Sequence, residues 1–258
     1  MKRRLGVVAN CIVGGDGTQN LKRIKDNGFE AFFASQEQYT RPVVSALKEQ
    51  AEKLGLYFDF IHGPFFGVNG LWSAEETPPL IAQIRESIDA ADEARVKTVV
   101  VHASSGWTPP PVSDRGLQRF DGLVEYAEKK NVILAFENLR KLGNLACLLD
   151  RYENNAHVRF CYDCGHAHCF TMNVPFLDFY GDKLVCTHIH DNHGVRGEDE
   201  HLLPFDGNID YAPVIRGFDR AGFAGTLMLV TTNERYGDMT PVEFLKTAYE
   251  RIERISKL

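Results

Sequence analysis

Short apolar segments alternate with amphipathic segments along the chain, and this alternation constrains the fold more than any other feature. The apolar segments are rich in Val, Ile, Leu and Phe and are nearly continuous, which is typical of parallel strands that are buried on both faces. Their spacing predicts a parallel sheet whose strands are connected by helices. The eight predicted strands span residues 5–9, 31–33, 58–61, 98–101, 132–136, 158–162, 184–187 and 226–230.

The segments between the predicted strands carry helix signals. In residues 114–130, apolar residues recur at intervals of three and four positions and form one face of a helix. Residues 73–76 (SAEE) and 240–243 (TPVE) match the capping box, so each predicts a helix N-terminus. Three glycines that can end a helix in the left-handed conformation follow helical stretches: Gly28, Gly55 and Gly222.

These repeats predict a single (β/α)₈ TIM barrel over residues 1–258, and a doubly wound open sheet is the alternative. The composition, 44% hydrophobic and 25% charged, excludes collagen, coiled-coil and disordered chains. No apolar run is long enough to span a bilayer, and the N-terminal one is too short for a signal peptide. We therefore expect a cytoplasmic protein whose six cysteines are reduced.

Five consecutive predicted strands are followed directly by a carboxylate or an imidazole. In a (β/α)₈ barrel, the C-terminal ends of the strands form the active site, so these side chains should converge. Burying such groups is costly unless they are paired, hydrogen-bonded or metal-bound, and a mixed nitrogen and oxygen set suits a divalent metal. The five residues are His62, His102, Glu137, Asp163 and His188.

Four more residues lie close to these strand ends. His190 is two positions after His188, so both side chains should point to one side of the strand. His166 lies in the turn that leaves the sixth strand. Asp199 and His201 lie in the loop after the seventh strand, where spacing alone does not separate a metal ligand from a solvated side chain.

Two other features each have two interpretations. Trp107 lies in the loop after the fourth strand, and it either lines a sugar pocket or packs the loop. The spacing of Cys161 and Cys164 suggests a zinc ribbon or a redox pair, but no second cysteine pair accompanies it. Because positions 161 and 164 face opposite sides of a strand, we predict that these are packing cysteines.

The order and spacing of these motifs resemble the xylose-isomerase-like barrels, which include sugar isomerases, sugar epimerases and endonuclease IV. In the epimerase branch a metal is held by Glu, Asp, His and Glu on strands five to eight. The resemblance implies Glu137, Asp163 and His188 as the first three ligands and His166 as a contact to substrate hydroxyls. The segments that carry the resemblance are Phe136-Glu137-Asn138, Asp163-Cys164-Gly165-His166, His188-Ile-His-Asp191 and Asp199-Glu-His201, which leads to Gly207-Asn-Ile-Asp210-Tyr.

The chain departs from this pattern at the fourth ligand position, which is Val230. In the epimerases that the resemblance implies, the two glutamates also exchange the substrate proton across an enediolate. Glu137 then lacks a partner carboxylate on the opposite face. The groups that remain as its acid or base partner are Glu234, His62, His102 and His166, and loss of activity is the other interpretation.

The endonuclease IV branch implies a larger, multi-zinc ligand set. The net charge of −6 and the lack of basic loops with interleaved aromatic residues argue against a DNA substrate. Arg140, Lys141 and Arg196 are too few for a phosphate track, although they suffice for one sugar phosphate or carboxylate. The matching positions are His62, His102, Glu137, Asp163, His166, His188, Asp199 and His201.

The sequence therefore predicts a metal-dependent isomerase or epimerase of a small sugar, sugar phosphate or sugar derivative, with one divalent ion (Mn, Mg, Co or Zn). The alternatives are a zinc-dependent abasic-site endonuclease and a non-catalytic barrel that binds a metal or a sugar. We expect no nucleic-acid or membrane partner, and a homo-oligomer is compatible with the sequence. The predicted residues are Glu137 and His166 for catalysis, His62, His102, His166, His190 and Trp107 for substrate binding, and Glu137, Asp163 and His188 for the metal, with Asp199 and His201 as further candidate ligands.

Overall fold

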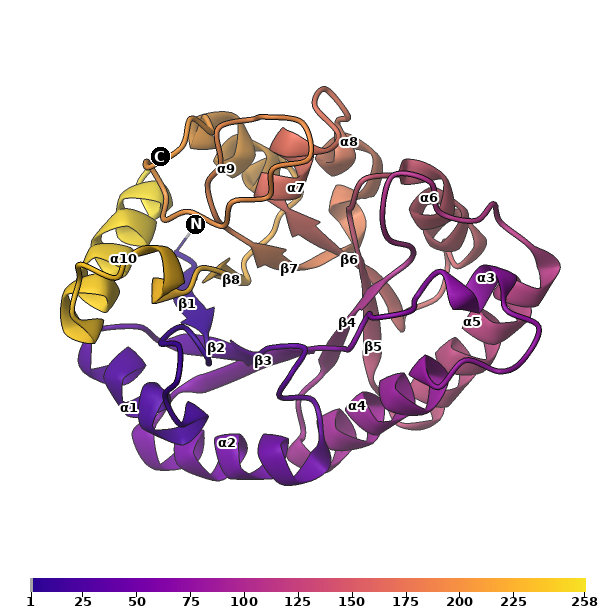
Figure 1. The fold of residues 1–258 in the computed structure, drawn as a ribbon, viewed down its shortest axis with the longest axis horizontal. Helices are drawn as coiled ribbons and strands as arrows, with labels where there is room; N and C mark the ends of the chain where they lie inside the picture. The colour runs from indigo at the N-terminus through magenta and orange to yellow at the C-terminus, as the bar shows by residue number, and fades with distance from the viewer. Residues whose placement is uncertain (1) are drawn as a thin grey trace.

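Eight parallel strands form the centre of the molecule in the computed structural model, which describes residues 2–258 (Figure 1). From β1 to β7 each strand pairs with the next one along the chain, β8 pairs with β1, and a single bridge between Ile189 and Leu229 joins the chain after β7 to β8. The predicted barrel is therefore confirmed, and every strand lies within two residues of its predicted bounds. The strands are β1 (Arg4–Val8), β2 (Ala31–Ala34), β3 (Tyr57–His62), β4 (Thr98–His102), β5 (Ile133–Glu137), β6 (Val158–Asp163), β7 (Leu184–His188) and β8 (Thr226–Leu229).

The barrel closes between β7 and β8 through a few hydrogen bonds near the C-terminal ends of these strands. The amide of Ile189 donates to the oxygen of Met228 at 2.7 Å, and the amide of Val230 donates to the oxygen of Ile189 at 3.1 Å. The hydroxyl of Thr187 donates to the oxygen of Thr226 at 2.9 Å. These bonds fix the chain next to His188 against the end of β8.

Helices surround the barrel on its outer side (Figure 1). They bury one face against the strands, as the three- and four-residue spacing predicts. No helix in residues 2–258 combines the length and the apolar character needed to cross a membrane. The helices are α1 (Gly17–Asp26), α2 (Arg41–Leu54), α3 (Gly70–Ser73), α4 (Leu80–Ala94), α5 (Asp114–Lys129), α6 (Leu142–Arg151), α7 (Cys164–Cys169), α8 (Phe176–Tyr180), α9 (Tyr211–Arg220) and α10 (Pro241–Ser256), with the short 3₁₀ helices η1 (Gly181–Lys183) and η2 (Asn233–Arg235).

One of the two predicted capping boxes is present and the other is wrong. Thr240 caps α10 in a complete capping box. Ser73 is instead the last residue of α3, and α4 begins at Leu80, directly after two prolines. Proline disfavours helical backbone in the residue before it, so the helix starts after the prolines. The three glycines adopt the predicted left-handed conformation, with φ of 94° at Gly28, 62° at Gly55 and 66° at Gly222.

Aromatic and sulfur-containing side chains pack the barrel below its C-terminal mouth. The rings of Phe33 and Phe60 stack at 4.7 Å, and both contact the ring of His188. The cysteines of the chain are free, and Cys161 and Cys164 are buried, as expected for packing cysteines. The strand ends therefore lie above a layer of buried side chains.

Asp59 on β3 makes the stability of the fold depend on pH. Burial raises its pKa to about 6, and the charge of Arg4 only partly opposes this shift. Between pH 4 and 6 the folded protein keeps a proton that the unfolded chain has lost, so stability falls as the pH rises through this window. We expect Asp59→Asn to be more stable than wild type above pH 6, by about 1–2 kcal/mol.

Urea unfolding at several pH values between 4 and 8 measures this difference. The gain in Asp59→Asn should shrink toward pH 4, where the wild-type carboxyl is protonated in both states. Asp238→Asn, which removes an exposed carboxylate, is the control and should show no such trend. A gain that stays constant from pH 4 to 8 would contradict the assignment.

Candidate active site

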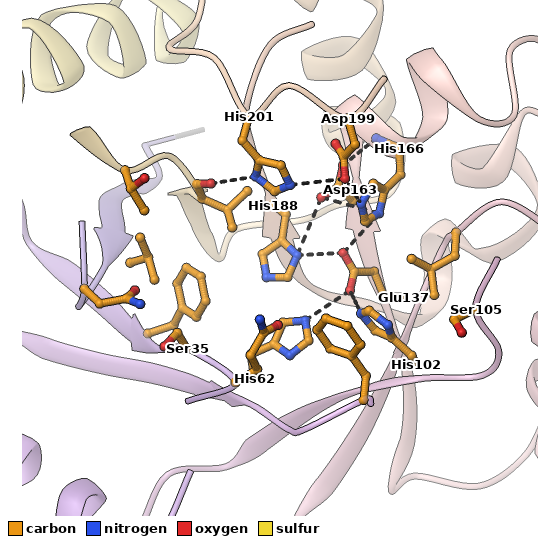
Figure 2. A pocket seen from close by; sticks show the side chains of 18 of the residues that line it. Ser35, His62, His102, Ser105, Glu137, Asp163, His166, His188, Asp199 and His201 are labelled. Atoms are coloured by element: carbon orange, nitrogen blue, oxygen red, sulfur yellow. Dashed lines mark hydrogen bonds and ion pairs between the residues drawn. The ribbon is translucent and has the colours of Figure 1, made fainter. Parts of the chain in front are cut away.

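The last residue of each of five consecutive strands points into the mouth of the barrel (Figure 2). Because the strands are parallel and in register, strand pairing places His102 beside Glu137 and Asp163 beside His188. All five side chains are buried. The predicted convergence is observed for His62, His102, Glu137, Asp163 and His188.

The carboxylate of Glu137 is the centre of this group. Its Oε2 lies 3.3 Å from Nε2 of His62 and 2.9 Å from Nε2 of His102. Its Oε1 lies 2.8 Å from Nδ1 of His188 and 3.3 Å from Nδ1 of His166. Burial raises the pKa of Glu137, but the charge of His188 and the hydrogen bonds from the other imidazoles outweigh burial and hold the pKa well below its ordinary value. Glu137 is therefore an anion at neutral pH.

The backbone around Asp163 fixes the second carboxylate. The side-chain amide of Asn138 donates to the backbone oxygen of Asp163 and accepts from its amide, both at 2.8 Å. Oδ1 of Asp163 accepts from the amide of His166 at 2.7 Å and from Nε2 of His190 at 3.0 Å. Position 165, between Asp163 and His166 in the sequence, is a glycine because the ring of His190 fills the space that a Cβ atom would need.

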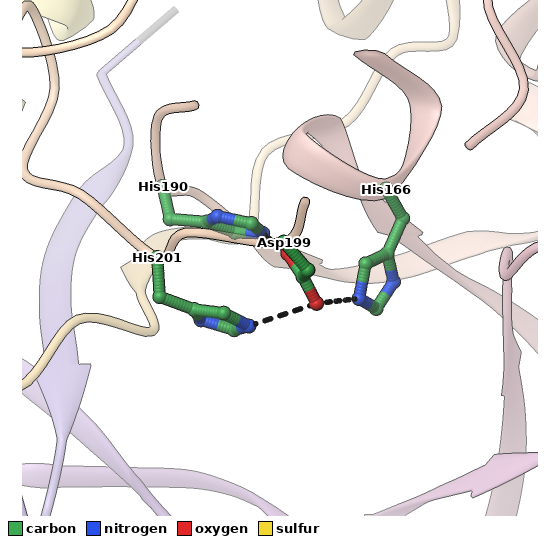
Figure 3. Close-up of side chains that lie close together, drawn as sticks. All are labelled: His166, His190, Asp199 and His201. Atoms are coloured by element: carbon green, nitrogen blue, oxygen red, sulfur yellow. Dashed lines mark hydrogen bonds and ion pairs between the residues drawn. The ribbon is translucent and has the colours of Figure 1, made fainter. Parts of the chain in front are cut away.

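The loop between β7 and α9 brings in a third carboxylate (Figure 3). Oδ2 of Asp199 lies 3.1 Å from Nε2 of His166 and 3.2 Å from Nε2 of His201. The rings of His201 and His190 stack at 4.0 Å. An antiparallel bridge between Asp191 and Leu202 holds this loop against the barrel. The structure thus joins Asp199 and His201 to the strand-end group.

Three imidazoles donate one ring N–H to a backbone carbonyl. A carbonyl oxygen carries no proton, so the nitrogen that faces it must be the protonated one, and the tautomer is fixed. The three nitrogen atoms are Nδ1 of His62 at 2.8 Å from the Gly63 oxygen, Nδ1 of His166 at 3.0 Å from the Asn138 oxygen and Nδ1 of His201 at 2.8 Å from the Val230 oxygen.

In their neutral form, these three rings point a lone pair at a carboxylate. Nε2 of His62 faces Glu137, and Nε2 of both His166 and His201 faces Asp199. Two electron-rich atoms at hydrogen-bond distance require a cation between them, either a proton or a metal ion. Histidines that bind metals share this arrangement, in which the second ring nitrogen donates to a carbonyl. The donor atoms therefore fit a divalent metal.

Three groups of side chains in residues 2–258 could hold such an ion, since their donor atoms lie within 4.8 Å of one another. Nitrogen and carboxylate oxygen donors suit Zn, Mn or Co. The three groups are His62 with Glu137 and His188, Glu137 with Asp163 and His166, and His166 with His190, Asp199 and His201.

A cavity of about 370 Å³ opens above the strand ends (Figure 2). Eight predicted site residues line it. Apolar side chains, polar side chains and one arginine complete its wall. A volume in this range suits a small molecule. The additional lining residues are Val8, Asn10, Phe33, Ser35, Gln36, Phe65, Ser105, Leu139, Arg140, Val230 and Thr232.

The match to known sequences covers most of the chain. Residues 21–255 match the family model described as Xylose isomerase-like TIM barrel. The chain belongs to this family. An uncharacterized protein of Methanocaldococcus jannaschii is 25% identical over 253 residues, which are 90% of this chain and 85% of that protein. An uncharacterized protein of Sinorhizobium fredii is 35% identical over 124 residues, and this match spans 45% of this chain and 39% of that protein.

Solved structures share the fold of this xylose isomerase-like barrel over nearly its full length. A 3-keto-D-glucoside 4-epimerase from E. coli superposes with a TM-score of 0.77 and 16% identity, over 98% of this chain and 100% of that one. A D-tagatose 3-epimerase-like protein superposes with a TM-score of 0.74 and 23% identity, over 97% of this chain and 98% of that one. At these identities the similarity shows the common fold.

Two predicted substrate-binding residues of this family member do not line the cavity. His190 is fully buried, because two residues after the end of β7 its ring stacks on His201 and contacts Asp163. Trp107 packs in the loop layer, where its ring contacts Arg196. Glu234, considered as a replacement for the missing carboxylate, is exposed on η2 and is also absent from the cavity wall.

Sequence reasoning did not single out the polar residues of β1, β2 and β8. Asn10, Ser35 and Thr232 follow the ends of these strands and line the cavity. Their signal is the same as that of the ionisable residues, a polar side chain directly after an apolar run. Short neutral side chains are also common in turns, so their type alone does not distinguish a site from a loop.

Val230 lines the cavity as an apolar residue of this barrel, and its carbonyl accepts the N–H of His201. Val230→Glu adds a carboxylate to a site that already has three. We expect the variant to bind Mn²⁺ or Zn²⁺ more tightly, by about tenfold or more. A residue that only hydrogen-bonds to a metal ligand changes metal affinity by this factor, and a carboxylate that binds the ion directly should change it at least as much. Titration against a chelator of known affinity measures this.

Val230→Gln is the matched control, since it has the same size without the charge. It should leave the metal affinity near that of wild type. Without metal, Val230→Glu should unfold at a lower temperature than Val230→Gln, because another buried anion is left uncompensated. Equal metal affinities for the two variants would show that position 230 does not face the metal.

Proposed function

We propose that this protein is a metal-dependent isomerase or epimerase of a small sugar or sugar derivative. The observation that carries the proposal is the ionised carboxylate of Glu137, buried in the cavity wall beside Asp163 and His188. An isomerase of this kind needs a carboxylate next to a Lewis acid in a site closed to bulk water. The epimerases among the solved structures of this fold support the same class of reaction.

Glu137, Asp163 and His188 would hold the ion, because Nδ1 of His188 lies 2.8 Å from Oε1 of Glu137 and 3.7 Å from Oδ2 of Asp163. A divalent ion bound there polarises a substrate carbonyl and makes the neighbouring C–H bond more acidic. The cavity supplies neutral hydrogen-bonding groups for hydroxyls. Oδ1 of Asn10, for example, is buried and has no hydrogen-bond partner among residues 2–258.

Glu137 and His166 are suited to move the proton. Glu137 is ionised, so it is in the form that removes a proton from carbon. Burial lowers the pKa of His166, but the charge of Asp163 and the hydrogen bond to Asp199 outweigh burial and raise the pKa well above its ordinary value. His166 is then protonated in the absence of a bound ion, and it can return the proton from the cavity wall.

On the wall that Val230 occupies, the available titratable group is His201. Its ring is held by the Val230 carbonyl and by Asp199. Burial lowers the pKa of His201, but the hydrogen bond to Asp199 outweighs burial and raises the pKa. His201 is therefore the second candidate for proton return, after His166, and lies on the wall where the family pattern has a carboxylate.

Exchange of substrate hydrogen with solvent tests the proposal. Wild-type protein with Mn²⁺ or Co²⁺ in D₂O should incorporate deuterium at the carbon next to the carbonyl of at least one member of a panel of ketoses, ketose phosphates and keto sugar acids. Glu137→Gln should lower the rate by about 10²-fold or more, the usual contribution of a positioned base. NMR spectroscopy and mass spectrometry of the recovered sugar measure the exchange.

Glu234→Gln is the control for this experiment, because Glu234 is exposed and lies outside the cavity. It should exchange at the wild-type rate. The proposal is wrong if wild-type protein with bound metal catalyses no exchange across the panel. A chain that binds metal and sugar without exchange is a binding protein.

One observation favours a second candidate, a zinc-dependent hydrolase that acts at abasic sites. His166, Asp199 and His201 form a further donor group beyond what one ion requires. Multinuclear zinc centres activate water and stabilise the leaving oxygen in phosphodiester cleavage. The net charge of −6 disfavours DNA binding, so we rank this function second.

Metal content separates the two functions. Protein purified without chelator should contain about one divalent ion per chain if it is an isomerase. Two or three zinc ions per chain, together with cleavage of a duplex that contains an abasic site, would favour the hydrolase. Elemental analysis and a nicking assay at low and high salt measure these quantities, and a chain without metal would contradict both functions.

A further inference from the structure

Arg140 lies on the cavity wall without a partner for its charge. It follows β5 by three residues and is half-buried. Among residues 2–258 no carboxylate forms an ion pair with it, and no side chain or carbonyl accepts from its guanidinium. Asp199, a carboxylate on the same wall, pairs with His166, His190 and His201 and not with Arg140. A guanidinium presented to a cavity in this way is free to bind an anion.

An aromatic stack holds Arg140 in place. Its guanidinium carbon lies 3.9 Å from the ring centroid of Phe170. The ring of His166 also stacks on Phe170, with centroids 5.0 Å apart and an interplanar angle of 23°. The unpaired cation and the proposed acid therefore contact the same phenyl ring. An arginine fixed by stacking loses less conformational entropy when it binds a ligand.

Two more cations lie near the ring of Trp107, outside the cavity wall. The guanidinium of Arg196 lies 4.6 Å from the ring of Trp107, and the ammonium of Lys141 lies 6.0 Å from it. Trp107 in turn contacts Phe170, with ring centroids 5.8 Å apart. We call Arg140, Lys141 and Arg196, with these two rings, the cationic rim.

The first turn of α6 adds to the positive potential of the cationic rim. This helix begins directly after Lys141, which provides no side-chain cap to the free amides. At Gly143, in the same turn, no atom lies within 4 Å of the position of a Cβ. Free amide groups at a helix N-terminus favour a nearby negative charge.

From these contacts we propose that Arg140 recognises an anion, and that the substrate is a sugar that carries a phosphate or a carboxylate away from its reacting carbon. This inference rests on the proposed function, because it deepens the substrate class of the same cavity. A neutral sugar leaves the guanidinium unpaired. A phosphate or a carboxylate gives it a charge-assisted, bidentate partner beside the ring that His166 also contacts.

Calorimetry on the full chain with its metal tests this with matched ligand pairs at low salt. The pairs are D-fructose 6-phosphate with D-fructose, and D-glucuronate with D-glucose. We expect the charged member of at least one pair to bind at least tenfold more tightly, and the phosphate and carboxylate pairs separate the two kinds of anion. Arg140→Gln should remove this preference by about tenfold or more, and Arg140→Lys should keep part of it.

Arg216→Gln is the matched control, since Arg216 is an exposed arginine on α9 outside the cavity. It should keep the wild-type preference, and circular dichroism should show that all variants are folded. Equal affinity for charged and neutral ligands in wild type, no binding of either charged ligand, or an unchanged preference in Arg140→Gln would each overturn the inference.

The binding measurement does not depend on turnover, so it separates this inference from the proposed function. A preference for anions that Arg140→Gln removes, without hydrogen exchange on any sugar, supports the anion site and contradicts the isomerase. Hydrogen exchange on neutral sugars, with an Arg140→Gln variant that binds and reacts like wild type, supports the isomerase and contradicts the anion site.

Discussion

The C-terminal end of the barrel depends on how the buried carboxylate of Glu137 is compensated. An isolated carboxylate in the mouth of a barrel would be strongly destabilising, so the surrounding elements must supply compensating groups. β3, β4 and β7 each supply an imidazole, and α7 supplies His166. The C-terminal end of the barrel is thus organised by electrostatic compensation, whereas apolar packing organises the layer below it.

Backbone carbonyls fix the tautomers of three imidazoles at this end of the barrel. Because Gly63, Asn138 and Val230 each accept one ring N–H, the imidazoles that they hold present an unprotonated nitrogen toward the carboxylates. This arrangement is unfavourable unless a cation is bound. The same contacts therefore prepare the site either for metal ions or for a set of protonated imidazoles, and the pH and the metal supply decide between them.

The sequence was sufficient to predict the strands and most of the site for one physical reason. Strands covered on both faces are nearly continuous apolar runs, so the residue at which the run stops marks the mouth of the barrel. This rule places His62, Glu137 and Asp163 together without knowledge of a single contact. This rule fails where the chain leaves the sheet. The loop conformations that bury His190 and direct Trp107 away from the cavity depend on tertiary packing.

β7 and β8 are linked by a few hydrogen bonds, whereas the other neighbouring strands form regular ladders. Val230 at the end of β8 affects how strongly these two strands are held together. A glutamate at that position would let one ion cross-link both sides of the joint, whereas valine leaves it to hydrogen bonds around Thr187 and Ile189. An ion held by Glu137, Asp163 and His188 would then reinforce β5 to β7 but not β8. We therefore expect the barrel to open first between β7 and β8. The amide protons of β8 should then exchange with solvent before those of the other strands.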